Sequence, residues 1–130
     1  MPSVAAEHIP TVLIVEDEPA LRRLMCLLLR DEGFAVRSAA NGIEALARLN
    51  EMPPDLMLVD LMMPGMDGRT FLIEARAAGH RIPAMIVSAS PEAGQVAAEL
   101  NCAAYIPKPY DFNELVTEMR RVLARVPAAV

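Results

Sequence analysis

The chain has 130 residues, 54% of them apolar, and a formal net charge of −5, so it is long enough to bury one core and is expected to form one domain. Its basic residues are scattered, which disfavours a nucleic acid or an anionic membrane as a direct partner. No apolar run approaches the roughly 20 residues that cross a bilayer, and residues 1–10 lack a secretion signal, so we expect a cytoplasmic protein.

The composition changes little between residues 11 and 125, which we expect to be the folded domain. Residues 1–10 have little pattern and are predicted to be a disordered lead-in, and residues 126–130 a short tail. The two cysteines, Cys26 and Cys102, form no C-x-x-C pair, and their spacing favours neither a zinc site nor a disulfide framework. We expect two free thiols.

The first strand is predicted at residues 12–15, a continuous apolar run. Pro19 suits the first turn of the helix that follows, which Gly33 ends. Four residues of this helix recur at the spacing of a core-facing stripe: Leu21, Leu24, Met25 and Leu28. This pattern places Cys26 among arginines on the polar side and Leu27 at its margin.

The second strand is predicted at residues 34–39. Asn41 can cap the next helix, with Glu44 three residues later, and that helix is expected to run to about Asn50. After the rigid turn at Pro53 and Pro54, the third strand covers residues 56–59. A loop rich in Pro and Gly, residues 63–68, then leads into a third helix that ends near residue 79.

The fourth strand is predicted at residues 84–88. Ser90 resembles an N-cap with Pro91 at the first helical position, and the helix to about residue 100 should be weakly held because it contains Gly94. A fifth strand covers residues 103–106. Asp111 caps the last helix, together with Glu114, and its inward positions are predicted to be Leu115, Met119, Val122 and Leu123.

Five strand and helix pairs joined by short loops predict an α/β fold, a doubly wound parallel sheet. Four of its strands run into polar residues: Glu16 and Asp17, Asp60, Ser88, and Lys108. The carboxyl ends of parallel strands share one edge, where ligands bind in such sheets. Three carboxylates, a hydroxyl and an ammonium would therefore meet in one pocket, a composition suited to Mg²⁺ and a phosphoryl group.

Each of these residues also has a simpler interpretation. Glu16 and Asp17 could merely favour the start of a helix, and Asp60 could form an Asx turn. Ser88 could be an ordinary strand-end hydroxyl and Lys108 a solvated cation, although the prolines on both sides of Lys108 fix its backbone. A further aromatic residue, Tyr105, could simply fill the core.

The segment Asp60-Leu61-Met62-Met63-Pro64-Gly65-Met66-Asp67-Gly68, with Glu16-Asp17 before it and Tyr105-Ile106-Pro107-Lys108-Pro109 after it, closely resembles the receiver domain of bacterial two-component response regulators. The likeness covers about residues 11–125. It implies a flavodoxin-like fold of five parallel strands in the order 2-1-3-4-5 with five helices, and a cis Lys108-Pro109 bond.

The resemblance implies that Asp60 accepts a phosphoryl group from a histidine kinase or a histidine phosphotransfer protein. Asp60 and Asp17 would be ligands of Mg²⁺, or of Mn²⁺, with Glu16 acting through water and Met62 through its backbone carbonyl. Lys108 and Ser88 would hold phosphoryl oxygens. Phosphorylation would draw Ser88 inward and give Tyr105 room to rotate, and the weak helix after Ser88 would shift.

Two features depart from a plain receiver pattern. Met62 lies near the path of a hydrolytic water, and because a thioether cannot orient water, we expect Met62 to influence the lifetime of the phosphate. Cys26 on the polar side of the first helix and Leu27 at its margin are either scattered surface hydrophobes or a docking surface for a kinase or a phosphotransfer helix.

The predicted function is a phosphorylation switch that controls an unknown downstream protein, as a monomer or weak homodimer, and that is not an enzyme apart from supporting its own phosphorylation and dephosphorylation. One alternative is a magnesium-dependent phosphatase with Asp60 as nucleophile, but Met62 stands where such enzymes usually carry a second acid. Another is a degenerate receiver that binds partners without phosphate, but its acids and Lys108 would normally be lost.

Overall fold

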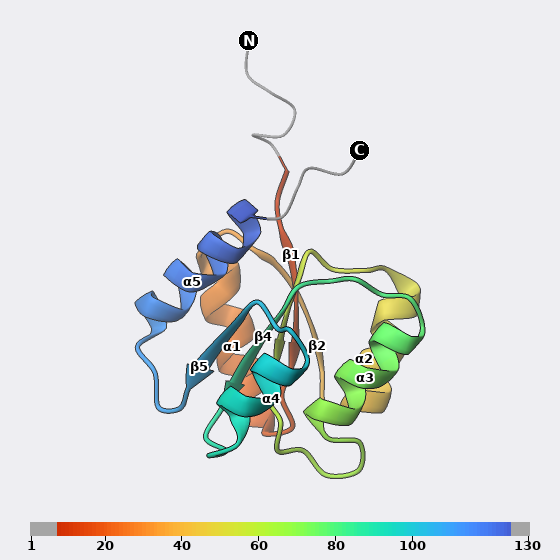
Figure 1. Cartoon of the computed structure of the whole chain (residues 1–130). Helices are drawn as coiled ribbons and strands as arrows, with labels where there is room; N and C mark the ends of the chain where they lie inside the picture. The colour runs from red at the N-terminus through yellow and green to blue at the C-terminus, as the bar shows by residue number, and fades with distance from the viewer. Residues whose placement is uncertain (1–7, 126–130) are drawn as a thin grey trace.

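A computed structural model of the protein describes residues 8–125. Its centre is a five-stranded parallel sheet with the strand order β2-β1-β3-β4-β5, so the predicted order is confirmed. The strands alternate with helices along the chain (Figure 1). The strands are β1 (Thr11–Val15), β2 (Ala35–Ala39), β3 (Leu56–Val59), β4 (Ala84–Ser88) and β5 (Ala104–Pro107).

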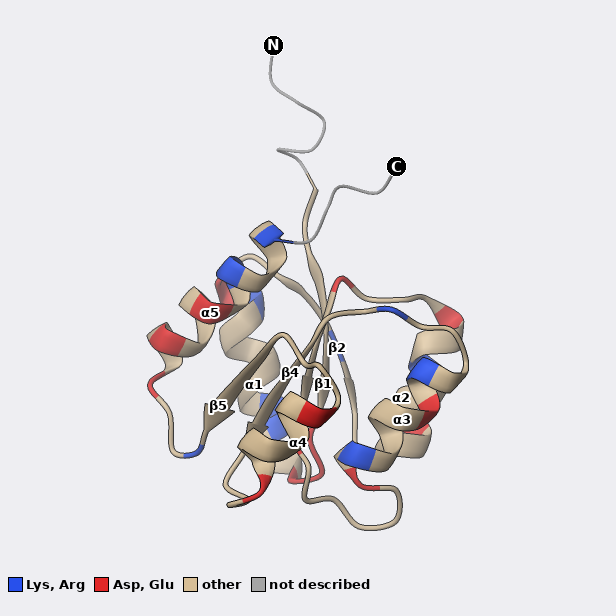
Figure 2. Cartoon of the chain, viewed as in Figure 1, with Lys and Arg blue, Asp and Glu red and all other residues tan. Residues whose placement is uncertain are grey.

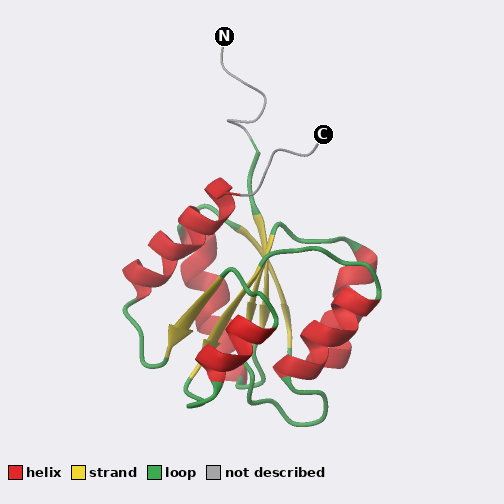
Figure 3. Cartoon of the chain, viewed as in Figure 1, coloured by secondary structure: helices red, strands yellow, loops and turns green. Residues whose placement is uncertain are grey.

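Five helices cover the two faces of the sheet (Figure 3). Helices α1 and α5 pack on one face, and α2, α3 and α4 pack on the other, which gives the doubly wound α/β fold that was predicted. Their bounds are α1 (Pro19–Asp31), α2 (Gly42–Glu51), α3 (Gly68–Ala77), α4 (Ala93–Glu99) and α5 (Phe112–Arg125).

The three central strands are buried along almost their whole length because helices cover them on both faces. Every residue of β3 and β4 is buried, as are all residues of β1 after Thr11. The edge strand β5 alternates between half-buried and exposed residues. The continuous apolar runs in the sequence therefore mark the strands that end beside the site.

Side-chain caps fix where four of the helices begin, and at α1 the carboxylate of Glu18 accepts from the N–H of Ala20. The carboxylate or amide oxygens of Asn41, Asp67 and Asp111 accept hydrogen bonds from backbone N–H groups of the first turns of α2, α3 and α5. The Asn41 cap was predicted together with Glu44, whose carboxylate in turn accepts from the N–H of Ala40. These caps lie on the connections that lead from the strand ends into the helices.

The core-facing stripe of α1 is displaced along the sequence by one residue relative to the prediction. Met25, Cys26 and Leu29 are buried, whereas Leu24 is 51% exposed and Leu28 is 37% exposed. The prediction that Cys26 lies on the polar side is wrong. In this orientation Arg22 donates to the carbonyls of Glu16 and Asp17, just after β1, and Arg30 donates to the carbonyl of Val36.

Helix α4 begins later than predicted. Ser90 does not cap it, because the hydroxyl of Ser90 accepts from the N–H of Glu92 within a turn, and the helix starts at Ala93. The residue before the helix, Glu92, makes no side-chain cap hydrogen bond. Helix α4 is thus short and begins without the Ser90 cap that the sequence predicted, so it lacks one of the usual supports of a helix start.

The chain just before β1 contacts the fold. The carbonyl of Pro10 accepts from the N–H of Ala35, and the His8 ring lies 3.1 Å from the carboxylate of Asp55. The other residues of the predicted lead-in, 1–7, and the predicted tail, 126–130, lie outside the described residues. Within residues 8–125, none of the helices is both long and apolar enough to cross a membrane.

Candidate functional site

The polar residues predicted to meet at the carboxyl edge of the sheet do meet there. Backbone hydrogen bonds hold the residue that follows each strand: the N–H of Glu16 donates to Ala39, the N–H of Asp60 to Val15, and the N–H of Lys108 to Ser88. Each bond extends the sheet by one residue beyond the strand. The site is therefore built on the rigid part of the fold.

Three carboxylates form the floor of the site. Glu16, Asp17 and Asp60 each offer one oxygen, and these oxygens all lie within 4.8 Å of one another. Glu16 is 4% exposed and Asp60 is 8% exposed, while Asp17 is half-buried. Three carboxylates this close repel one another unless a cation lies between or beside them.

Lys108 supplies one such cation from the end of the edge strand β5. Its Nζ donates to Oε1 of Glu16 at 2.9 Å and to Oδ2 of Asp60 at 3.0 Å. The peptide bond that follows, Lys108–Pro109, is cis, as the resemblance implied. Figure 2 shows blue in the loop that follows β5 and red in the turn at the lower end of β1, both at the lower edge of the sheet.

The environment shifts the pKa of two of these groups. Burial raises the pKa of Glu16, although Lys108 and the N–H of Glu18 act in the opposite direction. Burial alone would lower the pKa of Lys108, but its hydrogen bonds to Glu16 and Asp60 outweigh burial and raise that pKa. Lys108 therefore stays an ammonium group at neutral pH, and the site accommodates further positive charge.

The turn after β1 is held by a residue that the sequence did not single out. The guanidinium of Arg22 donates to the backbone carbonyl of Glu16 at 2.9 Å and to that of Asp17 at 3.3 Å. The N–H of Glu18 donates to the Glu16 carboxylate. Arg22 thus positions both acids through their backbone carbonyls and not through their carboxylates. Only the three-dimensional fold could reveal this role, because Arg22 looks like any surface arginine of a helix.

The loop after β3 positions the Asp60 carboxylate. The N–H of Met62 donates to Oδ1 of Asp60 at 3.1 Å, and the Met62 side chain is 65% exposed. The N–H of Gly68 donates to the carbonyl of Leu61, which closes the loop against the strand end. Both Asp60 oxygens therefore have a partner: a backbone N–H on Oδ1 and Lys108 on Oδ2.

Ser88 and Tyr105 lie on the two neighbouring strands. Ser88 is fully buried, and its hydroxyl accepts from the N–H of Ser90 at 3.1 Å. Tyr105, on β5, is 37% exposed and lies beside Gly94 of α4. Because Tyr105 is this exposed, the simpler interpretation that it fills the core is wrong.

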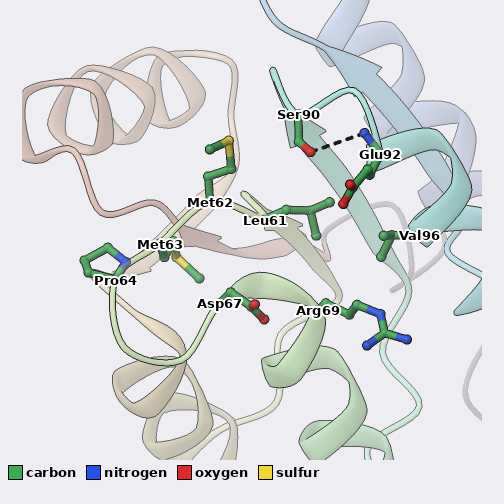
Figure 4. A pocket seen from close by; sticks show the side chains of 9 residues that line it. All are labelled: Leu61, Met62, Met63, Pro64, Asp67, Arg69, Ser90, Glu92 and Val96. Carbon is green, nitrogen blue, oxygen red and sulfur yellow. Dashed lines mark hydrogen bonds between the residues drawn. The ribbon is translucent and has the colours of Figure 1, made fainter.

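A shallow hollow of about 560 Å³ opens beside the site, between the loop after β3 and the start of α4 (Figure 4). Met62, Met63 and Pro64 form one side of it. Ser90 and Glu92 stand across from them, joined by the hydrogen bond drawn as a dashed line. The hollow is open enough for a partner's side chain to approach the site from this side.

The two residues predicted to form a docking surface have different environments. Leu27 is 60% exposed on α1, as expected of such a surface. Cys26 is only 7% exposed and belongs to the core beneath α1. Cys26 therefore contributes to packing, and of this pair Leu27 is the residue that a partner can reach.

The donor set fits a small divalent cation. Carboxylate oxygens and a neighbouring backbone carbonyl are the ligands that Mg²⁺ prefers, and Mg²⁺ commonly binds one or two carboxylates while keeping several waters. Asp17 and Asp60 each offer a carboxylate oxygen to this cluster, and Met62 lies two residues after Asp60 in the loop that follows β3. Nitrogen and sulfur donors that would favour zinc are missing from the carboxylate cluster that the described residues form.

A buried carboxylate at the end of a central parallel strand, with a lysine and two further acids around it, defines a class of phosphoacceptor sites on doubly wound sheets. Comparison with known proteins agrees with this class. The family model described as "Response regulator receiver domain" matches residues 12–120, so the chain belongs to the response regulator receiver domain family of two-component systems.

Individual relatives support the same assignment. The chain is 38% identical over 121 residues to the transcriptional regulatory protein BaeR of Escherichia coli, covering 92% of this chain and 50% of BaeR. It is 38% identical over 116 residues to the sensory transduction protein RegX3 of Mycobacterium tuberculosis, covering 88% of this chain and 51% of RegX3. The chain thus spans about half the length of these relatives.

Solved structures of receivers share the fold. A CheY-like response regulator receiver domain protein from Methanospirillum hungatei superposes with a TM-score of 0.83 at 27% identity, covering 90% of this chain and 95% of that one. The response regulator protein TrrA from Thermotoga maritima, in complex with Mg²⁺-BeF, gives a TM-score of 0.79 at 27% identity, covering 88% and 99%.

Proposed function

We propose that Asp60 is the phosphoacceptor of this receiver domain. The observation that carries the proposal is the pair of contacts on its carboxylate, the Met62 N–H on one oxygen and Lys108 on the other, within a cluster that also holds Glu16 and Asp17. These contacts fix the carboxylate in one orientation at a rigid strand end. A nucleophile held in this way needs little reorganisation before an in-line attack on phosphorus.

In the proposed reaction an Asp60 carboxylate oxygen forms a bond to the phosphorus of a phosphohistidine while the phosphorus–nitrogen bond breaks. The released imidazole takes up a proton, and Asp60 becomes an acyl phosphate. Water later attacks the phosphorus, the bond between phosphorus and the Asp60 oxygen breaks, and inorganic phosphate leaves, which restores the carboxylate. The donor would be a histidine kinase or a histidine phosphotransfer protein.

The residues around Asp60 would bind the cation and contact the phosphoryl group, so that the negative charge of the phosphoryl group is neutralised. Asp17 and Asp60 would bind Mg²⁺ directly, with Glu16 through water and Met62 through its carbonyl, and the cation would supply charge neutralisation for the phosphoryl group. Mn²⁺, which also prefers oxygen ligands, would serve as well. Lys108 would exchange its contact with Asp60 for a phosphoryl oxygen, as a point charge.

The switch would begin at Ser88. Its buried hydroxyl lies on the strand next to that of Asp60 and is joined to the turn that opens α4 through the N–H of Ser90. A hydrogen bond from Ser88 to a new phosphoryl oxygen would displace this turn, and with it α4 and Tyr105. Output would then pass to a downstream protein through the moved surface.

Kinase docking is proposed for the exposed side of α1 around Leu27. This surface lies at the helix whose start follows Asp17, so a bound partner would be close to the acceptor. Replacing Leu27 with Glu should slow phosphotransfer from the cognate kinase and leave phosphorylation by acetyl phosphate unchanged. An equal loss of both reactions would show that the substitution damages the domain itself.

Incubation with Mg²⁺ and acetyl phosphate, followed by intact mass measurement, tests the proposed function. We expect a transient phosphoryl adduct on the wild type that Asp60→Asn abolishes and that EDTA prevents. Steady hydrolysis of added phosphomonoesters would instead support the phosphatase alternative. A protein that is folded, binds Mg²⁺ and never forms the adduct would support the degenerate receiver.

A further inference from the structure

Gly94 of α4 faces the ring of Tyr105 without a side chain of its own. A Cβ placed on Gly94 would stand 3.4 Å from Cε2 and 3.5 Å from Cδ2 of the Tyr105 ring. These are ordinary van der Waals distances, so a methyl group would fit against the ring without moving it. With glycine at this position, that contact is missing, and the ring is 37% exposed.

The same glycine weakens the helix that carries it. Gly94 is the second residue of α4, a helix of seven residues whose start has no side-chain cap hydrogen bond. Glycine in a helix is less favourable than alanine because it loses more backbone freedom on folding. Helix α4 is therefore held mainly by its buried residues Ala93, Val96 and Ala97.

From these two observations we infer that Gly94 is a positioning residue that sets how firmly Tyr105 and α4 are held in the resting arrangement. Because Gly94 makes no Cβ contact with the Tyr105 ring and has a low helix propensity, the resting arrangement of the ring and α4 is only weakly stabilised. The inference rests on the proposed function, in which phosphorylation at Asp60 moves this turn, helix and ring.

Gly94→Ala tests the inference because alanine adds both the missing contact and the missing helix propensity. The ring contact exists only in the resting arrangement, whereas helix propensity stabilises α4 wherever the helix lies, so the ring contact should make the variant respond less readily to phosphorylation. Beryllofluoride, which stands in for the phosphoryl group on a carboxylate, provides the readout. We expect its half-saturating concentration, measured by NMR with saturating Mg²⁺, to rise about fivefold in Gly94→Ala.

A second background separates the ring contact from helix propensity. Tyr105→Leu removes the aromatic ring, so the same alanine substitution made in Tyr105→Leu can act through propensity alone. The increase in half-saturating concentration should therefore be smaller in this background than in the wild type. Equal increases in the two backgrounds, or no increase in either, would overturn a role that acts through Tyr105.

The unphosphorylated protein gives an independent measurement. In Gly94→Ala the amides of α4 should exchange more slowly with solvent, and the methyl group introduced by the substitution should show a nuclear Overhauser effect to the Tyr105 ring. A missing effect to the ring would contradict the geometry on which the inference depends. If beryllofluoride binds the wild type and Asp60→Asn equally, the proposed function itself fails, and the inference falls with it for that separate reason.

Discussion

Gly68, the first residue of α3, lies directly against the backbone of Asp60. A Cβ built on Gly68 would overlap the carbonyl oxygen of Asp60 and crowd the carbonyl carbon of Asp60 and the Cα of Leu61 at 2.9 Å. Neither of these neighbours is a flexible side chain that could move aside. Glycine is therefore required here by the close approach of a helix start to the end of β3, and not by an unusual backbone angle.

This contact predicts that Gly68→Ala displaces the acceptor loop. The variant should lose about 2 kcal/mol of unfolding free energy, measured in urea, because the added methyl group overpacks a rigid site. It should also accept phosphate from acetyl phosphate much more slowly than the wild type. Gly79→Ala is the matched control: Gly79 has a φ of +95° and no neighbouring atom within 4 Å of an added Cβ. That control should cost about 1 kcal/mol through backbone strain and leave phosphorylation unchanged; a normal rate in Gly68→Ala would refute the argument from close approach.

Because Lys108 contacts both Glu16 and Asp60, we predict that its positive charge weakens the binding of Mg²⁺ to the same carboxylates. Lys108→Gln removes the ammonium that contacts Glu16 and Asp60, so without Mg²⁺ the variant should lose about 1 to 2 kcal/mol of stability. Mg²⁺ should bind it at least about threefold more tightly, since a competing positive charge has gone. Isothermal titration calorimetry measures the affinity, and weaker binding would contradict this account of the charges.

Both cysteines should react slowly in the folded protein. Cys26 is buried, and burial raises the pKa of the Cys102 thiol, which lowers the fraction of reactive thiolate at neutral pH even though Arg76 acts in the opposite direction. Labelling with Ellman's reagent at about neutral pH should be slower for both residues than for a free thiol. Cys102→Ala assigns the two rates, and full labelling should follow in urea. Rapid labelling of Cys102 in the native protein would show that its surroundings differ from those described.

An ion pair between α3 and α4 should contribute little to stability and more to local order. The guanidinium of Arg69 lies 3.8 Å from the carboxylate of Glu99, both side chains are about half exposed, and Gln95 also donates to Glu99. Arg69→Glu should lower global stability by no more than about 0.5 kcal/mol. Amide exchange in α4 should nevertheless become faster, and adding Glu99→Arg should reverse part of that change. If amide exchange in α4 is unaltered, this pair does not help to hold the helix.

The sequence predicted the sheet well because its strands carry a strong and unambiguous pattern. β1, β3 and β4 are continuous apolar runs that end in polar residues, and parallel topology alone brings Glu16, Asp60 and Lys108 together. The caps at Asn41 and Asp111 were equally readable, since a cap is a local contact between residues that are neighbours in the chain.

The rotation of α1 could not be read from the sequence. Leucines occupy both of its candidate stripes, so periodicity favours neither. The observed orientation brings Arg22 to the carbonyl of Glu16, just after β1, and Arg30 to the carbonyl of Val36 in β2. The same holds for Gly68 and Gly94. Their roles come from residues that only the fold brings beside them, Asp60 in one case and Tyr105 in the other.

The position of the phosphate is the most direct test of the account. Protein phosphorylated with acetyl phosphate and Mg²⁺ is reduced with borohydride, which converts a phosphorylated aspartate to homoserine, and the product is mapped by peptide mass spectrometry. We predict homoserine in place of Asp60, with Asp17 unmodified. Homoserine elsewhere in the chain, with Asp60 intact, would contradict the assignment of Asp60 as the acceptor.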